Sequence, residues 1–260
     1  MSLRNIRIVV SYDGTNFCGW QEQSKGRSVQ AVIQDALAAH HRHPVHVGGA
    51  GRTDAGVHAT GQCANFVTDI DSIPGDRFAT VLNSILPADV RVSESAEVPA
   101  EFHARYDARM RMYKYYVTVG RSSPPCSRLY AHRVSIAPNI DRLNRDAACL
   151  IGEHDFATFA SAADGNGSTV RTVYSASFSV RRAMIVFSIA ADGFLWKMVR
   201  SIVGSLLANG PNRVPLRDAL EMRDRSASGT TAPAHGLFLH KVCYDVEHEF
   251  SRSAFSSRHA

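Results

Sequence analysis

Apolar and polar residues alternate at the start of the chain, which is the pattern of a half-buried β-strand. The apolar positions of this stretch are Ile6, Ile8, Val10 and Tyr12. A stripe with helical spacing follows between Val29 and Leu37, and Ser28 directly before it is a residue type that caps helices. We therefore predict a strand over 6–12 and then a helix that begins after Ser28 and ends near His40.

The same reading extends to about residue 92. Short apolar runs predict strands over 45–49 and 62–67, on either side of a glycine-rich bend. Apolar residues at helical spacing between Phe78 and Leu86 predict a second helix, which Pro87 would stop. Val90 and Val92 predict a further strand, so this half of the chain has the order β-α-β-β-α-β.

Residues from about 106 onward repeat this order. Alternation between Tyr113 and Val119 predicts a strand. Asn139 is a candidate cap for a helix that runs to Ile151, with Gly152 as the residue that ends it. The remaining predicted elements are a hairpin of strands over 171–178 and 184–190, a helix from Phe194 to Asn209 that ends at Gly210-Pro211, a short helix that begins at Pro215, and a strand over 237–244.

This repeated order predicts an α+β protein. Each half is of the βαββαβ type, with an antiparallel-rich sheet and helices on one side, and two such halves would enclose a cleft. We expect an N-terminal half over 1–105 and a C-terminal half over 106–245. Residues 246–260 lack any periodicity, so we expect a disordered tail there.

Composition is compatible with several kinds of partner and only narrows the choice of partner and compartment. Hydrophobic residues make up 45% of the 260 residues, and the net charge of +5 favours an anionic partner without requiring one. The five cysteines are odd in number and far apart, which argues against a disulfide framework. No apolar run approaches the roughly 20 residues of a membrane span. We expect a cytoplasmic protein with reduced thiols and no membrane association.

Four histidines cluster just after the first predicted helix, at His40, His41, His43 and His46. Metal binding there would need ligands to converge around Pro44 without help from a local carboxylate. A solvated helix end and loop is the favoured interpretation. We therefore predict no metal site.

The segment Gly48–Ala59 concentrates chemistry, since it holds one aspartate, one arginine and four glycines. Glycines at this density indicate left-handed backbone or close approach of another group. The spacing matches neither the dinucleotide fingerprint nor the phosphate-binding loop, because Val57 and His58 stand where that loop needs lysine and a hydroxyl. Asp54 is then either a turn residue in a hairpin or a functional carboxylate.

Residues Gly51-Arg-Thr-Asp-Ala-Gly-Val-His58 resemble the active-site signature of the tRNA pseudouridine synthase A family. Further matches occur in that family's order, between about residues 6 and 245. They are Tyr12-Asp-Gly-Thr, Gly19-Trp-Gln, Ser28-Val-Gln, Phe102-His-Ala-Arg, Tyr113-Lys-Tyr, Met198-Val-Arg-Ser-Ile-Val-Gly-Ser-Leu and Gly236-Leu-Phe-Leu. In this chain Trp196-Lys197 precedes the Met198 motif, where family members often have other residues.

The resemblance implies a cofactor-free homodimeric isomerase that converts uridine to pseudouridine at tRNA positions 38, 39 and 40, in the anticodon stem and loop. It makes Asp54 the catalytic residue, which would attack sugar or base or remove a sugar proton. Arg200 would be the ion-pair partner of Asp54, although by pattern alone it is an arginine at the edge of an apolar stripe.

The resemblance also implies substrate contacts. Tyr113 would be a further catalytic residue, stacking on the extruded base with its phenol within proton-transfer reach, while alternation alone makes it a core aromatic. Arg52 and Arg105 would contact the RNA backbone or fill the space that a flipped base leaves. Leu237 would pack against the uracil, or simply belong to the core. Two rival functions stand beside this one: an RNA-binding module without catalysis, and a metal-dependent phosphate-hydrolysing enzyme built on the glycine bend.

Overall fold

A computed structural model describes residues 3–161, 167–181, 184–208 and 214–245. The chain forms two compact units. Unit 1 comprises Met1–Arg111 and Leu239–Ala260, and unit 2 comprises Met112–Phe238. The predicted tail over 246–260 lies outside the described residues.

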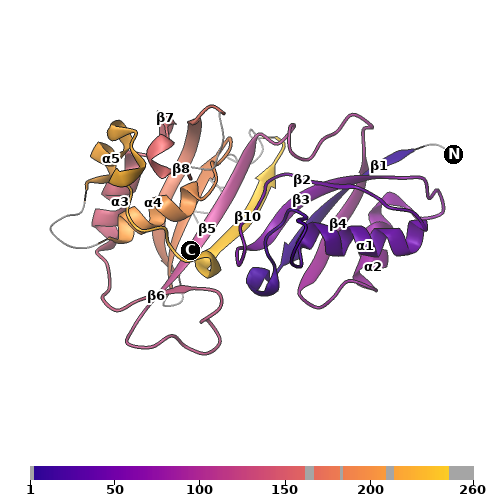
Figure 1. Cartoon of the computed structure of the whole chain (residues 1–260), viewed down its shortest axis with the longest axis horizontal. Helices are drawn as coiled ribbons and strands as arrows, with labels where there is room; N and C mark the ends of the chain where they lie inside the picture. Colours follow the sequence, from indigo (N-terminus) through magenta and orange to yellow (C-terminus); the bar gives the residue numbers. More distant parts are fainter. Residues whose placement is uncertain (1–2, 162–166, 182–183, 209–213, 246–260) are drawn as a thin grey trace, which may run out of the picture. The chain divides into compact units, whose positions relative to one another are not determined.

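Unit 1 is built around strands in the order β4-β1-β3-β10, and β2 also pairs with β3 (Figure 1). Strand β1 lies between β4 and β3 and pairs antiparallel with both. The elements of this unit are β1 (Arg4–Tyr12), η1 (Gly14–Asn16), α1 (Val29–His41), β2 (Val47–Gly49), β3 (His58–Thr68), η2 (Gly75–Arg77), α2 (Phe78–Asn83), β4 (Val90–Val98) and β10 (Leu237–Cys243), the last of which enters the unit at Leu239.

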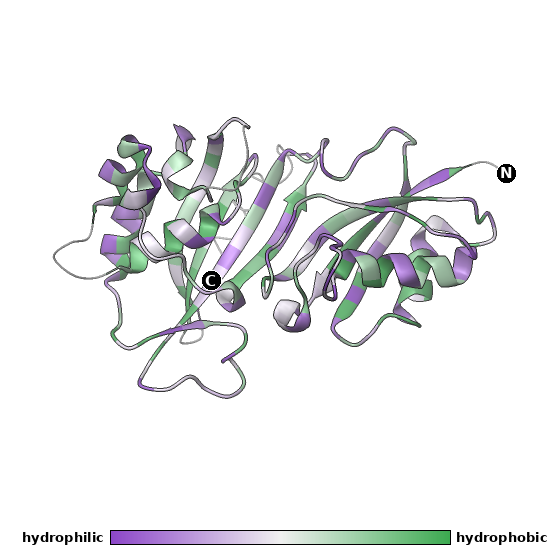
Figure 2. Cartoon of the chain, viewed as in Figure 1, coloured by the Kyte–Doolittle hydropathy of each residue, from purple (hydrophilic) through white to green (hydrophobic). Residues whose placement is uncertain are grey.

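Both helices of unit 1 cover the face of the sheet that the alternating pattern marks as apolar. Phe66 of β3 packs edge-on against Phe78 of α2, with ring centroids 5.3 Å apart, and also against His41 of α1. Ile6 of β1 lies opposite Phe66 and is fully buried. Helix α1 begins as predicted, because the Ser28 hydroxyl accepts a hydrogen bond from the Ala31 N–H. Figure 2 shows the mixture of hydrophilic and hydrophobic residues along α1 that such one-sided burial requires.

Unit 2 contains the strand order β5-β9-β8-β7, and a short strand β6 pairs parallel to β5. Strand β8 pairs antiparallel with both β7 and β9. The pair β8 and β9 is the predicted hairpin. The elements of this unit are β5 (Met110–Val119), β6 (His132–Val134), α3 (Ile140–Ala148), β7 (Gly152–Asp155), η3 (Ala157–Phe159), β8 (Val170–Arg181), β9 (Met184–Ala191), α4 (Met198–Leu207), α5 (Leu216–Met222), η4 (Arg225–Ala227) and η5 (Ala234–Gly236).

Helix α3 is fastened to the sheet of unit 2 by one side chain. The amide of Asn144 donates to the Phe178 carbonyl at 3.1 Å and accepts from the Phe178 N–H at 2.7 Å, so it pairs with the backbone of β8. Asn139 caps α3 as predicted. The antiparallel-rich sheets with packed helices confirm the predicted α+β class.

Three predicted helix boundaries are wrong. Helix α2 ends at Asn83, because the Asn83 side chain bonds to Val92 of β4 in both directions. Helix α3 ends at Ala148, and Gly152 instead begins β7 with a positive φ of 112°. Helix α4 begins at Met198, directly after Lys197 in the left-handed region. The predicted end of α4 at Gly210-Pro211 lies outside the described residues.

Within the described part of the chain, no helix has both the length and the apolar character that crossing a bilayer requires.

Candidate active site

Asp54 lies in the loop that connects β2 to β3 in unit 1. Its backbone carbonyl accepts from the Val57 N–H at 3.1 Å, which closes a four-residue turn. Gly56, the third residue of this turn, has a φ of 76°, a conformation that glycine adopts without steric cost. The turn leaves Asp54 partly exposed and Arg52 exposed, so both charged groups of the loop reach solvent.

A second loop, residues 13–20, holds the Asp54 loop through backbone contacts. The Trp20 N–H donates to the Thr53 carbonyl at 3.1 Å, and the Gly56 N–H donates to the Phe17 carbonyl at 3.3 Å. Gly19 also forms an isolated β-bridge with Asp54. The backbone is therefore held at Thr53, directly before Asp54, and at Gly56, two residues after it.

Glycines allow the two loops to approach this closely. A Cβ atom on Gly14 would overlap the carbonyl oxygen of Val57, and one on Gly19 would lie 2.5 Å from the carbonyl oxygen of Thr53. Gly19 also has a φ of 114°. The glycines in Tyr12-Asp-Gly-Thr and Gly19-Trp-Gln thus serve the same site as those of the Asp54 loop, which spacing along the chain did not reveal.

Buried side chains hold the rest of the Asp54 loop. The Tyr12 and Thr53 hydroxyls lie 2.8 Å apart and share a hydrogen bond. The Gln62 amide donates to the Gly51 carbonyl at 2.7 Å, and the Arg111 guanidinium donates to the Ala50 carbonyl at 3.1 Å. Sequence reasoning missed all of these contacts, because a side chain that bonds to a group far away along the chain leaves no pattern. Their residue types and their position on strands were the only available signal.

His58, the last residue of the signature, is buried beneath this loop. Its Nδ1 atom accepts from the Gly14 N–H at 3.0 Å and lies 3.2 Å from a carboxylate oxygen of Asp13. Asp13 in turn accepts from the N–H and hydroxyl of Thr15. His58 therefore fixes the second loop to the strand that leaves the first, which is an architectural role inside the signature motif.

The remaining predicted residues of unit 1 are arginines. The Arg52 Nε donates to the Gln21 side-chain oxygen at 3.2 Å, so it is oriented along the second loop. Arg105 is exposed on a turn after β4, and its carbonyl accepts from the same Arg111 guanidinium that holds Ala50. Arg52 lies in the same loop as Asp54. Arg105 is linked to that loop by Arg111, which donates to the carbonyls of both Arg105 and Ala50.

The other predicted residues belong to unit 2. Arg200 lies on α4, where its Nε donates to the Ala232 carbonyl at 2.8 Å and its own carbonyl accepts from the Ala232 N–H at 3.0 Å. Tyr113 of β5 is 8% exposed and packs edge-on against Phe194, with ring centroids 5.1 Å apart. Leu237 is buried at the start of β10.

Tyr115, two residues after Tyr113, is another aromatic group near the Arg200 segment. Its hydroxyl donates to the Pro233 carbonyl at 2.9 Å, next to the residue that holds Arg200. Burial raises the pKa of the Tyr115 phenol well above its ordinary value, and the Arg200 charge opposes this only in part. Tyr115 is therefore a neutral hydrogen-bond donor that fixes the segment around Ala232.

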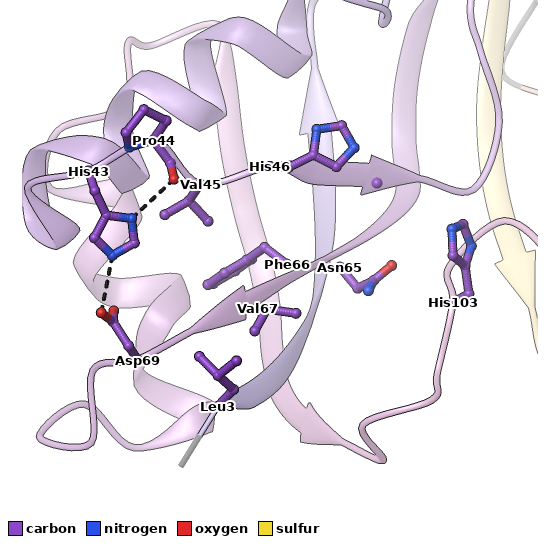
Figure 3. Close-up of a pocket in the computed structure, with 11 residues that line it drawn as sticks. Leu3, His43, Pro44, Val45, His46, Asn65, Phe66, Val67, Asp69 and His103 are labelled. Atoms are coloured by element: carbon purple, nitrogen blue, oxygen red, sulfur yellow. Dashed lines mark hydrogen bonds and ion pairs between the residues drawn. The ribbon is translucent and has the colours of Figure 1, made fainter. Parts of the chain in front are cut away.

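Two histidines of the cluster, His43 and His46, line a surface pocket of about 400 Å³ in unit 1, shown in Figure 3. His43 and Asp69 form an ion pair at 3.1 Å on its rim, and Asn65 and Phe66 form part of its wall. Its lining contains none of the predicted site residues. The full lining is Leu3, His43, Pro44, Val45, His46, Gly48, Asn65, Phe66, Val67, Asp69 and His103.

The individual histidines of this cluster have separate structural partners. His41 is buried between the Leu37 carbonyl and the Thr68 hydroxyl, each 2.8 Å from a ring nitrogen. His43 bonds to the Pro44 carbonyl and to Asp69, and these two contacts raise the pKa of its imidazole. Among the described residues, no group of three or more His, Cys, Asp or Glu side chains is arranged to hold a metal ion.

Comparison with known proteins adds the family. The sequence profile of a family described as tRNA pseudouridine synthase matches residues 8–107 and 147–245. A protein of Treponema denticola named tRNA pseudouridine synthase A is 43% identical over 249 residues, which cover 93% of each chain. Proteins of the same name from Acetivibrio thermocellus and Citrifermentans bemidjiense are 40% and 41% identical, over 93% of this chain and 100% and 98% of their own.

Proposed function

Because this chain belongs to the tRNA pseudouridine synthase family, we propose that it acts on uridines 38, 39 and 40 of the tRNA anticodon stem and loop. The isomerisation of tRNA uridine to pseudouridine is the activity of the family, and the chain is an isomerase of that class. The observation that carries this conclusion is 43% identity extending over 93% of both chains. The choice of the three positions rests on the resemblance of the sequence motifs.

The reaction breaks the bond between N1 of uracil and C1′ of ribose and forms a bond from C5 to C1′. C5 loses a proton and N1 gains one, so the overall change is an isomerisation with no net oxidation or reduction. The protein must hold the detached base in place, which is catalysis by positioning. It must also supply a group that attacks or removes a proton, which a carboxylate can do.

Asp54 is our proposal for that group. Its loop is held by the residue 13–20 loop, by Tyr12 and by Gln62, and its side chain remains partly exposed. A fixed backbone with a reachable carboxylate is what a nucleophile or base requires. We assign Arg200 as the ion-pair partner of Asp54, because a guanidinium can bind both carboxylate oxygens and keep the group ionised.

The other assignments concern the substrate. In this proposal Tyr113 stacks on the target base and Leu237 packs against the uracil. Arg52 and Arg105, both exposed, contact the RNA backbone. We further propose a cytoplasmic homodimer, in which one protomer supplies the catalytic residues and its partner supplies backbone contacts. Light scattering at micromolar concentration tests the dimer, and a fully active monomer would refute it.

Exchanging Asp54 for Asn tests the catalytic assignment, because Asn keeps the shape and removes the charge. We expect tRNA affinity to stay within a few-fold, since recognition is spread over many basic groups. The rate should fall by more than about a hundredfold, as removal of an acid, base or nucleophile usually does. The measurement is single-turnover release of tritium from tRNA labelled at C5 of uridine, beside a binding titration.

Asp35→Asn is the matched control, because Asp35 is an exposed carboxylate on α1. It should react at the wild-type rate. If Asp54→Asn kept more than a tenth of the wild-type rate, a loss of less than about 1.4 kcal/mol, Asp54 would be a turn residue only. Mapping of pseudouridines in the product by mass spectrometry tests positions 38–40 separately. A wild-type protein that binds tRNA and releases no tritium would instead be an RNA-binding module.

A further inference from the structure

Tyr106 is the most exposed large aromatic group among the described residues of unit 1, with 76% of its surface accessible. Tyrosine usually has its ring buried and only its hydroxyl in contact with water. A ring exposed to this extent buries little apolar surface on folding. The turn that carries it, residues 103–107, therefore needs an explanation outside the fold.

This turn is tightly organised by its own hydrogen bonds. The Asp107 N–H donates to the His103 carbonyl at 3.1 Å, and the His103 N–H donates to the Asp107 carboxylate at 2.8 Å. The Nδ1 atom of His103 accepts from the Arg105 N–H at 3.1 Å. Both ends of the turn are thus closed, and the backbone on either side of Tyr106 is held.

The turn is also fastened to the rest of unit 1. The Ala104 N–H donates to the Asn65 side chain at 2.9 Å, and the Tyr244 hydroxyl donates to the Ala104 carbonyl at 2.8 Å. The Arg111 guanidinium donates to the Arg105 carbonyl. Because Arg111 also holds Ala50, the turn and the base of the Asp54 loop share one support.

The neighbours of the Tyr106 ring suit a nucleotide. The His103 imidazole lies against the ring, with centroids 4.3 Å apart and planes tilted by 39°. The Arg105 guanidinium lies 6.0 Å from the ring centroid. An aromatic ring beside an arginine can stack on a base and bind the adjacent phosphate, which is how proteins recognise unpaired nucleotides.

We propose that Tyr106 is a stacking platform for an unpaired nucleobase of the bound tRNA, with His103 supporting the ring and Arg105 contacting the adjacent phosphate. This inference rests on the proposed function, because that function supplies the RNA. Tyr106 is here a binding residue with no part in the chemical step. A rigid platform connected through Arg111 to the Asp54 loop would set the distance between this nucleotide and the reacting uridine.

The test compares Tyr106→Ala with Tyr106→Phe, using fluorescence anisotropy of a labelled, unmodified tRNA transcript at fixed salt. The Ala variant should raise the Kd by about 5- to 150-fold, the range that loss of one base–aromatic stack gives. The Phe variant should stay within about threefold of wild type, because it keeps the ring. Tyr130→Ala is the matched control, since Tyr130 is an exposed tyrosine of unit 2.

Several results would overturn the platform. An unchanged Kd for Tyr106→Ala would show that the ring does not meet RNA, and equal losses in both variants would assign the effect to the hydroxyl. A change of oligomeric mass for Tyr106→Ala, measured by light scattering, would assign the ring to a contact between copies of the chain. Absence of tritium release by the wild-type protein would count against the proposed function, whereas these binding results count against the platform alone.

Discussion

The two groups that we propose as ion-pair partners are held by different means. Asp54 stands in a loop whose backbone is fixed by a second loop and by side chains from strands. Arg200 stands on a regular helix, where its Nε atom and its own carbonyl both bond to Ala232. The backbone that carries the carboxylate is therefore held by several parts of unit 1, while the guanidinium is tied to the segment that contains Ala232.

The two regions nevertheless share one device, which is close backbone approach at a glycine. A Cβ on Gly14 would overlap the Val57 carbonyl oxygen, and a Cβ on Gly204 of α4 would overlap that of Thr230. In unit 1 this contact brings the second loop against the Asp54 loop. In unit 2 it brings α4 against the segment that contains Ala232. The proposed site residues in both units thus depend on close backbone approach at a glycine.

The largest effect should come from Gly14→Ala. The added methyl group meets backbone atoms that cannot rotate away, so we expect a loss of about 1–3 kcal/mol in the free energy of unfolding and a reduced tritium-release rate. Gly204→Ala should cost less, because alanine in a helix recovers about 0.5–1 kcal/mol. Denaturant unfolding of both variants measures the difference. Gly167→Ala is the control, since nothing lies within 4 Å of its Cβ, and an equally stable Gly14→Ala would refute close approach.

A smaller effect is expected for Arg200→Lys, which keeps the charge and loses the planar fork. It also loses the Nε bond to Ala232. The single-turnover rate should fall between that of wild type and that of Asp54→Asn, with tRNA affinity little changed. Arg142→Lys, on α3 of the same unit, controls for arginine loss near α4. A wild-type rate for Arg200→Lys would remove the paired guanidinium from the mechanism.

The smallest effect concerns His43, which is not one of the proposed site residues, and it depends on pH. Hydrogen bonds to the Pro44 carbonyl and to Asp69 raise the pKa of His43 above its ordinary value of 6.5, and the bond to His43 lowers the pKa of Asp69. The stabilisation is therefore fully present below pH 6.5 and is lost as pH rises through the raised His43 pKa. It also disappears in strong acid, as Asp69 is protonated.

Thermal unfolding of His43→Gln checks this sign. The variant should melt slightly below wild type at pH 5.5 and at the same temperature as wild type at pH 9. The exposed residue His40 supplies the control variant His40→Gln, which should leave the difference near zero at both values. A deficit that is larger at pH 9 would contradict the assigned direction of the pKa shift.

Local signals in the sequence predicted most of the fold. Ser28 and Asn139 cap their helices as expected, because a cap is decided by residues within one turn. The boundaries of α2 and α3 were missed where a distant partner intervened, as with Asn83 and β4. Tyr12 bonds to Thr53, and Arg111 bonds to Ala50, across long stretches of sequence that have no repeating pattern. The side chains that hold the Asp54 loop could therefore be identified only from the structure.

One feature of unit 1 affects how the protein is made. Its strand β10 comes from the end of the chain, after all of unit 2. Thr60 of β3 meets His240 at 3.0 Å, and the Arg109 N–H donates to the Cys243 carbonyl at 2.9 Å. A ribosome that has synthesised residues 1–111 has therefore not yet supplied the last strand of this sheet. The edge of β3 stays open to unwanted pairing until more than a hundred further residues have emerged, so the unit that carries Asp54 is completed only after unit 2 has been synthesised.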